Sequence, residues 1–186
     1  MISIEKAREL VEGEIENDNL RKHMLAVSKI MEALADKMKI TEEEKEKWIL
    51  VGLLHDLDYE RTKDNPKQHG IITAEMLKEE LPDECLEAIK AHNKRTGFEP
   101  NSVMGKALIA ADAVSGLIVP TALMMPTRKI SEVSVKSLKK KISDKSFARS
   151  VSRESIMVCE ELGFDRKEFF KLSLEALQGI SDDLGL

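Results

Sequence analysis

The chain has 186 residues, a length that suits one domain and is long enough to bury a substantial hydrophobic core. Its net charge of −5 excludes a uniformly basic nucleic-acid-binding protein but remains compatible with a local basic face. With 42% hydrophobic and 34% charged residues, the composition is that of a folded globular protein and excludes a disordered chain.

The first amphipathic segment spans residues 19–39, where apolar side chains and His23 recur at three- and four-residue steps. This period predicts a helix with one buried face. Thr41 begins a capping-box pattern, T-x-x-E, so a second helix is predicted from there to the dipeptide His55-Asp56. Aromatic residues make up only 4% of the chain, which also favours helices over an all-β fold.

The next segment is polar and contains a turn cluster, so a loop is predicted over residues 58–68. A third helix is expected to start near His69, which would lie in its first turn. Proline is tolerated in a first turn but not in a helix interior, so Pro82 predicts a new short helix that runs to His92. Both histidines therefore fall at helix ends.

The most apolar segment, residues 102–118, is rich in Gly and Ala. Small side chains let neighbouring backbones approach closely, so a central buried helix is predicted, with Asp112 in its middle. From Pro120 onward the sequence predicts Met-rich turns followed by weakly helical pieces. A last helix is predicted from the N-cap residue Asp165 through Ile180.

The cysteine pattern and the hydropathy bear on the cellular compartment. Cys85 and Cys159 stand alone, without CxxC spacing, so neither a cysteine zinc site nor a disulfide is predicted. The N-terminal segment is acidic where a signal peptide needs an apolar stretch, and no run approaches the roughly 18 apolar residues of a membrane span. We therefore expect a cytoplasmic protein without membrane contact.

All four histidines of the chain lie between residues 23 and 92, each on an apolar face or at a helix end. Buried imidazole and carboxylate groups cost free energy unless they are paired or coordinate a metal. Asp112 has few polar neighbours and therefore needs a cationic partner. The residues alone leave two interpretations open: hydrogen-bonded core histidines, or a metal site within a helical bundle.

The order of these residues along the chain resembles the HD-domain superfamily of metal-dependent phosphohydrolases. The order is His23, His55-Asp56, His69, His92 and Asp112. The local sequences LLHDLD, QHGIITAEML, AIKAHN and ALIAADAVSGL are similar to family segments, over roughly residues 19–118. The resemblance implies one all-α, single-domain helical bundle over residues 1–186, with a metal-site core at about 19–118 and a C-terminal helical extension at about 119–186.

The resemblance also implies roles for individual residues. One metal would be held by His23, His55, Asp56 and Asp112. Asp56 would be the catalytic carboxylate and would bridge to a second metal, for which His69 and His92 stand in the matching positions. The implied cofactor is one or two divalent ions per chain, with Mn, Fe, Co, Ni, Zn and Mg all compatible with these ligands.

The chain departs from the family after the His-Asp pair. Many members read His-Asp-Ile-Gly-Lys, whereas this chain continues with Leu57-Asp58-Tyr59 and lacks the lysine that would contact phosphate. Arg61, Lys63 and Lys94 are the candidates to replace it.

Residues 128–153 form a basic stretch in an otherwise acidic protein, so Arg149 and Arg153 are further candidates for contact with an anionic substrate. The alternative is that this stretch is the solvated face of a helix. Its only aromatic residue is Phe147, which disfavours binding of single-stranded nucleic acid.

The expected function is hydrolysis of a nucleotide or other small phosphorylated metabolite through metal-activated water. The sequence lacks a P-loop, a G-x-S-x-G elbow and a dinucleotide-binding fingerprint. Two alternatives stay open: a diiron oxygenase of the inositol-oxygenase type, and a non-catalytic nucleotide-binding or regulatory module. The sequence favours no particular oligomeric state.

Overall fold

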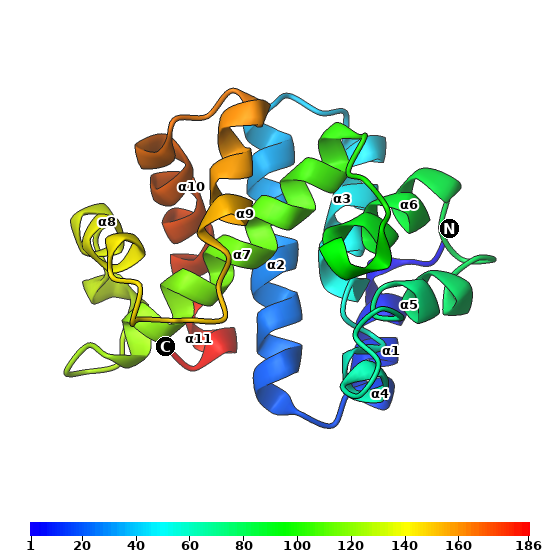
Figure 1. Ribbon diagram of the computed structural model, residues 1–186, viewed down its shortest axis with the longest axis horizontal. Coiled ribbons are helices and arrows are strands. Elements are labelled where there is room, and N and C mark those ends of the chain that lie inside the picture. The colour runs from blue at the N-terminus through cyan, green and yellow to red at the C-terminus, as the bar shows by residue number, and fades with distance from the viewer.

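The computed structural model describes residues 1–186, which form α-helices and short 3-10 helices without any β-strand (Figure 1). The prediction of an all-α fold is confirmed. The α-helices are α1 (Ile4–Glu14), α2 (Asp18–Lys37), α3 (Glu42–Leu54), α4 (Tyr59–Thr62), α5 (Ile71–Met76), α6 (Asp83–His92), α7 (Val103–Leu123), α8 (Val135–Ser143), α9 (Arg153–Met157), α10 (Arg166–Gln178) and α11 (Ser181–Leu184). The 3-10 helices are η1 (Lys94–Thr96), η2 (Ile130–Glu132) and η3 (Val158–Leu162).

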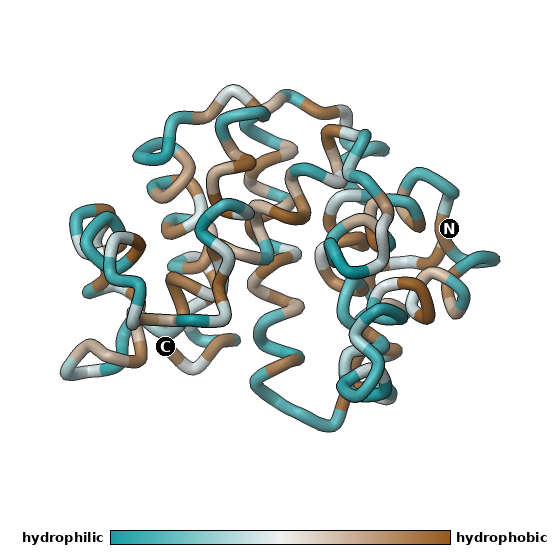
Figure 2. Tube along the Cα trace, in the orientation of Figure 1, coloured by the Kyte–Doolittle hydropathy of each residue, from teal (hydrophilic) through white to brown (hydrophobic).

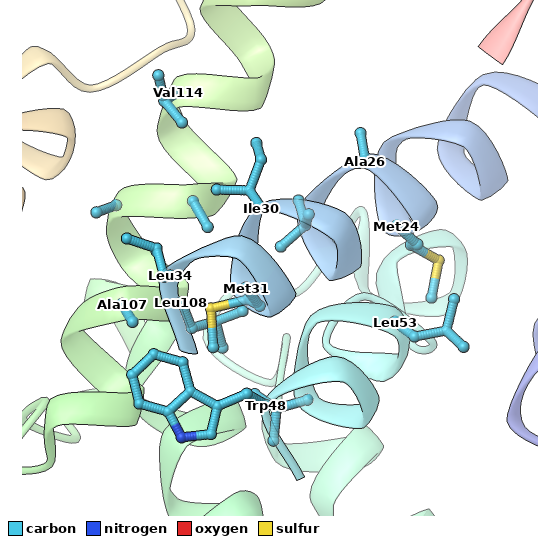
Figure 3. Close-up of a cluster of buried hydrophobic side chains, with 14 of the residues drawn as sticks. Met24, Ala26, Ile30, Met31, Leu34, Trp48, Leu53, Ala107, Leu108 and Val114 are labelled. Carbon is cyan, nitrogen blue, oxygen red and sulfur yellow. The ribbon is translucent and has the colours of Figure 1, made fainter. Parts of the chain in front are cut away.

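Helix α2 lies at the centre of the molecule, between α3 and the long helix α7 that crosses it (Figure 1). Its side chains Ile30, Met31 and Leu34 are fully buried, with Trp48 of α3 and Leu108 of α7 close by (Figure 3). Each such side chain contributes about 1.5–3 kcal/mol when it leaves water. A single core of 46 buried residues extends from α1 to α11, so the chain is one domain.

The polar surface follows the amphipathic pattern of the sequence. Helix α8, at the left edge of Figure 2, is mostly hydrophilic, and only Leu138 and Ile142 on its inner side are buried. Lys139 and Lys140 are exposed on the opposite side. The lysine-rich stretch is thus the solvated face of a packed helix, as one of the two interpretations of the sequence proposed.

Helices α2 and α3 pack so closely at Gly52 and Ser28 that their backbones are in contact. A Cβ atom on Gly52 would lie 2.7 Å from the Cα atom of Ser28, which leaves room only for glycine. The Ser28 hydroxyl donates a hydrogen bond to the carbonyl of Ile49 across the same contact. This contact fixes the end of α3, from which the chain continues directly into His55 and Asp56.

Helix α7 is long and apolar enough to span a membrane, with a mean hydropathy of 1.5 over its best window. The sequence predicted no apolar run of that length, because Lys106 and Asp112 interrupt it. Within the molecule 67% of that window is buried, with α2, α6 and α9 packed around the helix. Burial in the protein core therefore accounts for its apolarity.

Most predicted helices are present, with three main differences besides the short helix α4 (Tyr59–Thr62), a single turn within residues 58–68, which were predicted to be a loop. Helix α1 was not predicted, because its segment is mostly charged and only Ala7 and Val11 are buried. Helix α7 continues through Pro120 to Leu123, where the sequence predicted turns. The hydroxyl of Thr121 donates to the carbonyl of Leu117, so the last turn keeps hydrogen bonds although proline supplies no N–H.

The third difference concerns the segment that leads into α5. The helix begins at Ile71, so His69 precedes it and does not lie in its first turn. Gly70 is the N-cap residue, with a φ of +89° that glycine adopts without strain. A Cβ atom there would lie 2.8 Å from the carbonyl oxygen of Ile89 on α6. The glycine therefore lets the segment that carries His69 pack against α6.

Candidate metal centre

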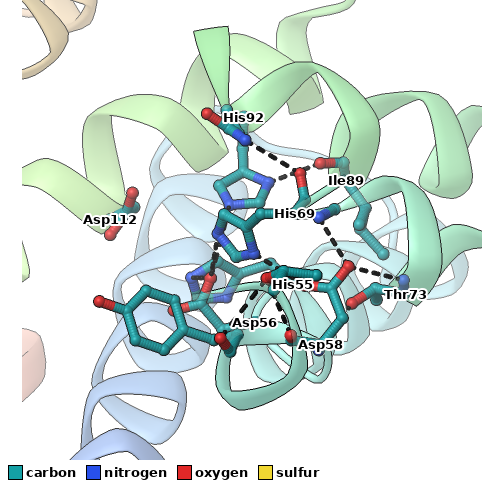
Figure 4. Close-up of polar contacts among 12 residues, drawn as sticks. His55, Asp56, Asp58, His69, Thr73, Ile89, His92 and Asp112 are labelled. Carbon is teal, nitrogen blue, oxygen red and sulfur yellow. Dashed lines mark hydrogen bonds and ion pairs between the residues drawn. The ribbon is translucent and has the colours of Figure 1, made fainter. Parts of the chain in front are cut away.

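The six residues that the sequence singled out as metal ligands come together at one place, and Figure 4 labels all of them except His23. Five elements supply them: His23 from α2, His55 and Asp56 from the end of α3, His69 from the segment before α5, His92 from the end of α6, and Asp112 from the middle of α7. The cluster thus depends on the central crossing of α2 and α7.

Two of the four imidazole rings are oriented by backbone carbonyls of their own helices. The Nδ1 atom of His55 lies 2.9 Å from the carbonyl oxygen of Gly52. The Nδ1 atom of His92 lies 2.5 Å from the carbonyl oxygen of Ile89. Because a carbonyl only accepts hydrogen bonds, each Nδ1 carries the proton, and each Nε2 presents its lone pair.

The other two rings are oriented by side chains. His69 Nδ1 lies 2.7 Å from a carboxylate oxygen of Asp58, which fixes the same tautomer. His23 Nδ1 lies 3.0 Å from the hydroxyl of Ser115. That hydroxyl donates its own proton to the carbonyl of Asp112, 2.8 Å away, so it accepts from His23. All four histidines therefore direct Nε2 into the cluster, where a neutral ring offers its lone pair.

These Nε2 atoms meet at the carboxylate of Asp56. Three of them lie 3.1–3.4 Å from its Oδ1 atom, namely those of His55, His69 and His92. The Nε2 atom of His23 lies 3.7 Å from Oδ2 of Asp56. Asp56 is thus the one group in reach of every imidazole.

Two further observations fit a bound cation. The buried Nε2 atom of His55 has no hydrogen-bond partner, although an unsatisfied buried polar atom is costly. The Nε2 atoms of His69 and His92 lie 3.0 Å apart, a distance at which two lone pairs repel unless a proton or a metal lies between them. A cluster of this kind fits a divalent metal ion.

The donor set divides into overlapping groups that suit one or two ions. Ligand atoms of His23, His55 and Asp112 all lie within 4.8 Å of one another, and so do those of His55, Asp56 and His92. Imidazole nitrogen with carboxylate oxygen suits Zn, Mn, Fe, Co and Ni. The structure brings all six predicted ligands together, and their role as ligands remains a prediction.

The cluster shifts the pKa of its members in opposite directions. Burial lowers the pKa of His55 to about 4, so its ring is neutral at pH 7. Burial also opposes ionisation of Asp56, but the surrounding imidazoles outweigh it and hold its pKa well below the usual range. Burial likewise disfavours protonated His69, yet its hydrogen bonds to Asp56 and Asp58 raise its pKa to about 10. The ionised carboxylates therefore attract a cation into the centre.

A cleft of about 470 Å³ opens onto the cluster. Its wall contains five of the six clustered residues, all except the fully buried His55. The opposite wall is the serine-containing segment around α9, with Ser150, Ser152 and Ser155. Tyr59 stands at the edge, with its ring perpendicular to that of His69 at a centroid distance of 5.4 Å. A small molecule that enters the cleft thus meets the cluster.

The basic residues predicted to contact substrate do not line this cleft. Three of them face acidic residues elsewhere: Arg61 pairs with Glu14, Lys63 with Glu60, and Lys94 with Glu154. These lysine and arginine side chains are half or more exposed, so such pairs contribute little to stability. They do not replace the missing lysine of the family motif in this structure.

Arg153 does not line the cleft either, and its contact with substrate stays a prediction. Its guanidinium donates hydrogen bonds to backbone carbonyls of the 142–151 segment, including those of Ala148 at 2.6 Å and Phe147 at 2.5 Å. It therefore holds the loop that forms one wall of the cleft. Arg149 is exposed on the same loop and likewise does not line the cleft.

The sequence analysis did not assign a role to Asp58, which is fully buried. Besides His69, its carboxylate accepts hydrogen bonds from the backbone N–H groups of Gly70 at 2.8 Å and Thr73 at 2.9 Å. Asp58 thus ties His69 to the start of α5. The only signal in the sequence was its place in the segment that departs from the family motif.

Comparison with known families gives one match. The family model described as HD domain matches residues 20–117, a range that contains all six clustered residues. Searches of curated proteins and of solved structures give no match.

Proposed function

The chain belongs to the HD domain family, a superfamily of metal-dependent phosphohydrolases, and from this membership we propose that it hydrolyses a phosphate ester of a nucleotide or other small metabolite. The observation that carries the proposal is the convergence of four Nε2 atoms on the Asp56 carboxylate. Such a cluster is costly to bury without a cation and well suited to hold one.

We assign the ligands by their positions in the cluster. His23, His55 and Asp112 would hold one ion and His69 and His92 a second, with Asp56 as a ligand available to both. When bound, a divalent cation supplies Lewis acidity to a phosphoryl oxygen and lowers the pKa of a coordinated water.

The residues of the chain supply a negatively charged ligand, a carboxylate that is open to the cleft, and hydroxyl groups for the substrate. Asp56 stays ionised, and its position within reach of all four rings makes it the catalytic carboxylate. The side chain of Asp112 is 36% exposed, so it faces the solvent of the cleft. Ser150 and Ser152 also line the cleft and supply hydroxyl groups that can donate hydrogen bonds to a phosphoryl group bound there.

The test is a panel of phosphate esters assayed with added Mn, Co, Ni and Mg. We expect release of inorganic phosphate that depends on the added ion, disappears with a chelator and is absent in Asp56→Ala. A panel without phosphate release in the presence of every ion would overturn the proposal. Iron-dependent oxygen uptake in the same samples would then favour the oxygenase alternative, and binding of nucleotide without turnover would favour the regulatory one.

A further inference from the structure

The wall of the metal cleft carries no lysine or arginine. Its charged groups, apart from the histidines, are the carboxylates of Asp56 and Asp112. A diphosphate or triphosphate brings three or four negative charges into a site, and proteins usually pair them with cationic side chains. In this cleft only the bound metal ions would balance the negative charge of the substrate. The cleft therefore suits a substrate with a single phosphoryl group.

A second compartment of about 360 Å³ adjoins the cleft. The two compartments share Asn19, His23 and Gly116, so the second one begins beside the metal cluster. It lies between α2, the last turns of α7 and the C-terminal residues. We call it the leaving-group pocket.

The leaving-group pocket combines apolar and polar side chains. The apolar ones are Val119, Pro120, Leu123, Leu184 and Leu186, and the polar ones are Asn19, Lys22, His23 and Ser115. Its one cation is Lys22, whose ammonium group lies 2.9 Å from the carboxylate of Asp18 and is neutralised by it. The apolar part of this concave wall favours an uncharged, hydrophobic ligand.

We propose that the substrate is a phosphomonoester with a neutral, largely apolar leaving group, and that this group occupies the leaving-group pocket while the phosphoryl group lies at the metal cluster. The inference rests on the proposed phosphohydrolase function and names its substrate class. Water adds to phosphorus and the ester P–O bond breaks, with its electron pair on the leaving oxygen. That oxygen takes a proton from the water, so the products are an alcohol and inorganic phosphate.

The charge argument is tested with one nucleoside carrying one, two or three phosphates, and the apolar argument with phenyl phosphate against glycerol phosphate. We expect kcat/KM to fall at least about tenfold from the mono- to the triphosphate, and phenyl phosphate to exceed glycerol phosphate by a similar factor, as about 1.4 kcal/mol of binding would give. A preference for the triphosphate, or equal rates for the two monoesters, would overturn the inference.

The pocket itself is tested by Leu123→Asn, with Met124→Asn as the matched control. Both side chains are exposed, at 51% and 62%, so both variants should fold, and only Leu123 lines the pocket. We expect Leu123→Asn to raise KM for phenyl phosphate several-fold, and by more than it changes KM for glycerol phosphate, with metal content unchanged. Met124→Asn should match the parent. Equal effects of the two variants would overturn the assignment.

A binding measurement separates this inference from the proposed function. Phenylphosphonate, which is not hydrolysed, is titrated into metal-loaded parent and variant proteins by calorimetry. If no ester is cleaved, the phosphohydrolase proposal fails. Weaker phenylphosphonate binding in Leu123→Asn alone would still support the pocket, and equal binding in parent and variant would reject it.

Discussion

At the scale of single residues, the site is defined by hydrogen bonds on the far side of each imidazole ring. The identities of the six clustered residues could be predicted from sequence, because their order along the chain resembles a family. Their orienting partners could not. Asp58 meets His69 only after the 58–68 loop closes, and Ser115 meets His23 across 92 positions of the chain. Sequence spacing carries no signal for either contact.

The role of Asp58 can be tested by Asp58→Asn. The amide keeps the shape but loses the charge that orients His69 and accepts two backbone N–H groups. Loss of such an orienting partner typically weakens metal affinity by about 10–100-fold. We expect this loss at one ion site in a calorimetric titration of chelator-treated protein. Asp64→Asn, in the exposed part of the same loop, is the control, and equal affinities in the two variants would refute the role of Asp58.

The number of ions is tested by His92→Ala. If His69 and His92 hold a second ion, the parent should bind close to two metal ions per chain, and the variant should lose about one while it keeps the other. Equilibrium dialysis followed by elemental analysis measures both. If the parent binds one ion and the variant binds the same amount, the two-metal prediction is contradicted and the site holds a single ion.

At the scale of elements, the site depends on close helix packing that hydropathy patterns only partly reveal. Start signals located α3, α6 and α10, namely the Thr41 capping box, Pro82 and the N-cap residue Asp165, and the amphipathic period located α2, which buries one apolar face. It missed α1, which buries few residues, and it ended α7 too early, because tertiary packing outweighs the unfavourable propensity of Pro120. The crossing of α2 and α7 that assembles the cluster follows from long-range contacts, which local pattern does not encode.

The packing of α2 against α3 is tested by Gly52→Ala. The added methyl group would meet the Ser28 backbone at 2.7 Å, so we expect a loss of about 1–3 kcal/mol in the free energy of unfolding, as overpacking generally gives. Gly13→Ala is the matched control, because nothing lies within 4 Å of its new methyl group on exposed α1. There we expect no loss and a gain of up to about 1 kcal/mol. Urea denaturation measures both, and similar values for the two variants would contradict the packing.

At the scale of the whole molecule, one core connects both ends of the chain to the site. Residues from Ile2 to Leu184 belong to it, so the C-terminal part beyond the family match packs with the metal-site part. The sequence predicted this single domain from its length and from the family resemblance. It did not predict that the C-terminal segment 184–186 and the loop around Ser150 help to line the two compartments beside the cluster.

The two cysteines report on the integrity of this core. Both are fully buried, and burial raises the pKa of Cys85 to about 12 and that of Cys159 to about 11. Native protein at pH 8 should therefore not react with a thiol reagent, whereas both thiols should react in denaturant. Burial of the neutral thiols also makes the free energy of unfolding depend on pH. Because the folded-state pKa values are raised, the contribution of the two thiols is complete below pH 9 and should decrease as the pH rises toward 11–12. Rapid labelling of the native protein would contradict the burial.

The central claim is that the convergent histidines and carboxylates form a metal centre. Elemental analysis of the purified chain and of Asp56→Ala, both dialysed against the same divalent ion, tests it most directly. We expect at least one equivalent of metal in the parent and almost none in the variant, because Asp56 lies within reach of all four Nε2 atoms. Equal metal content in the two proteins would contradict the claim.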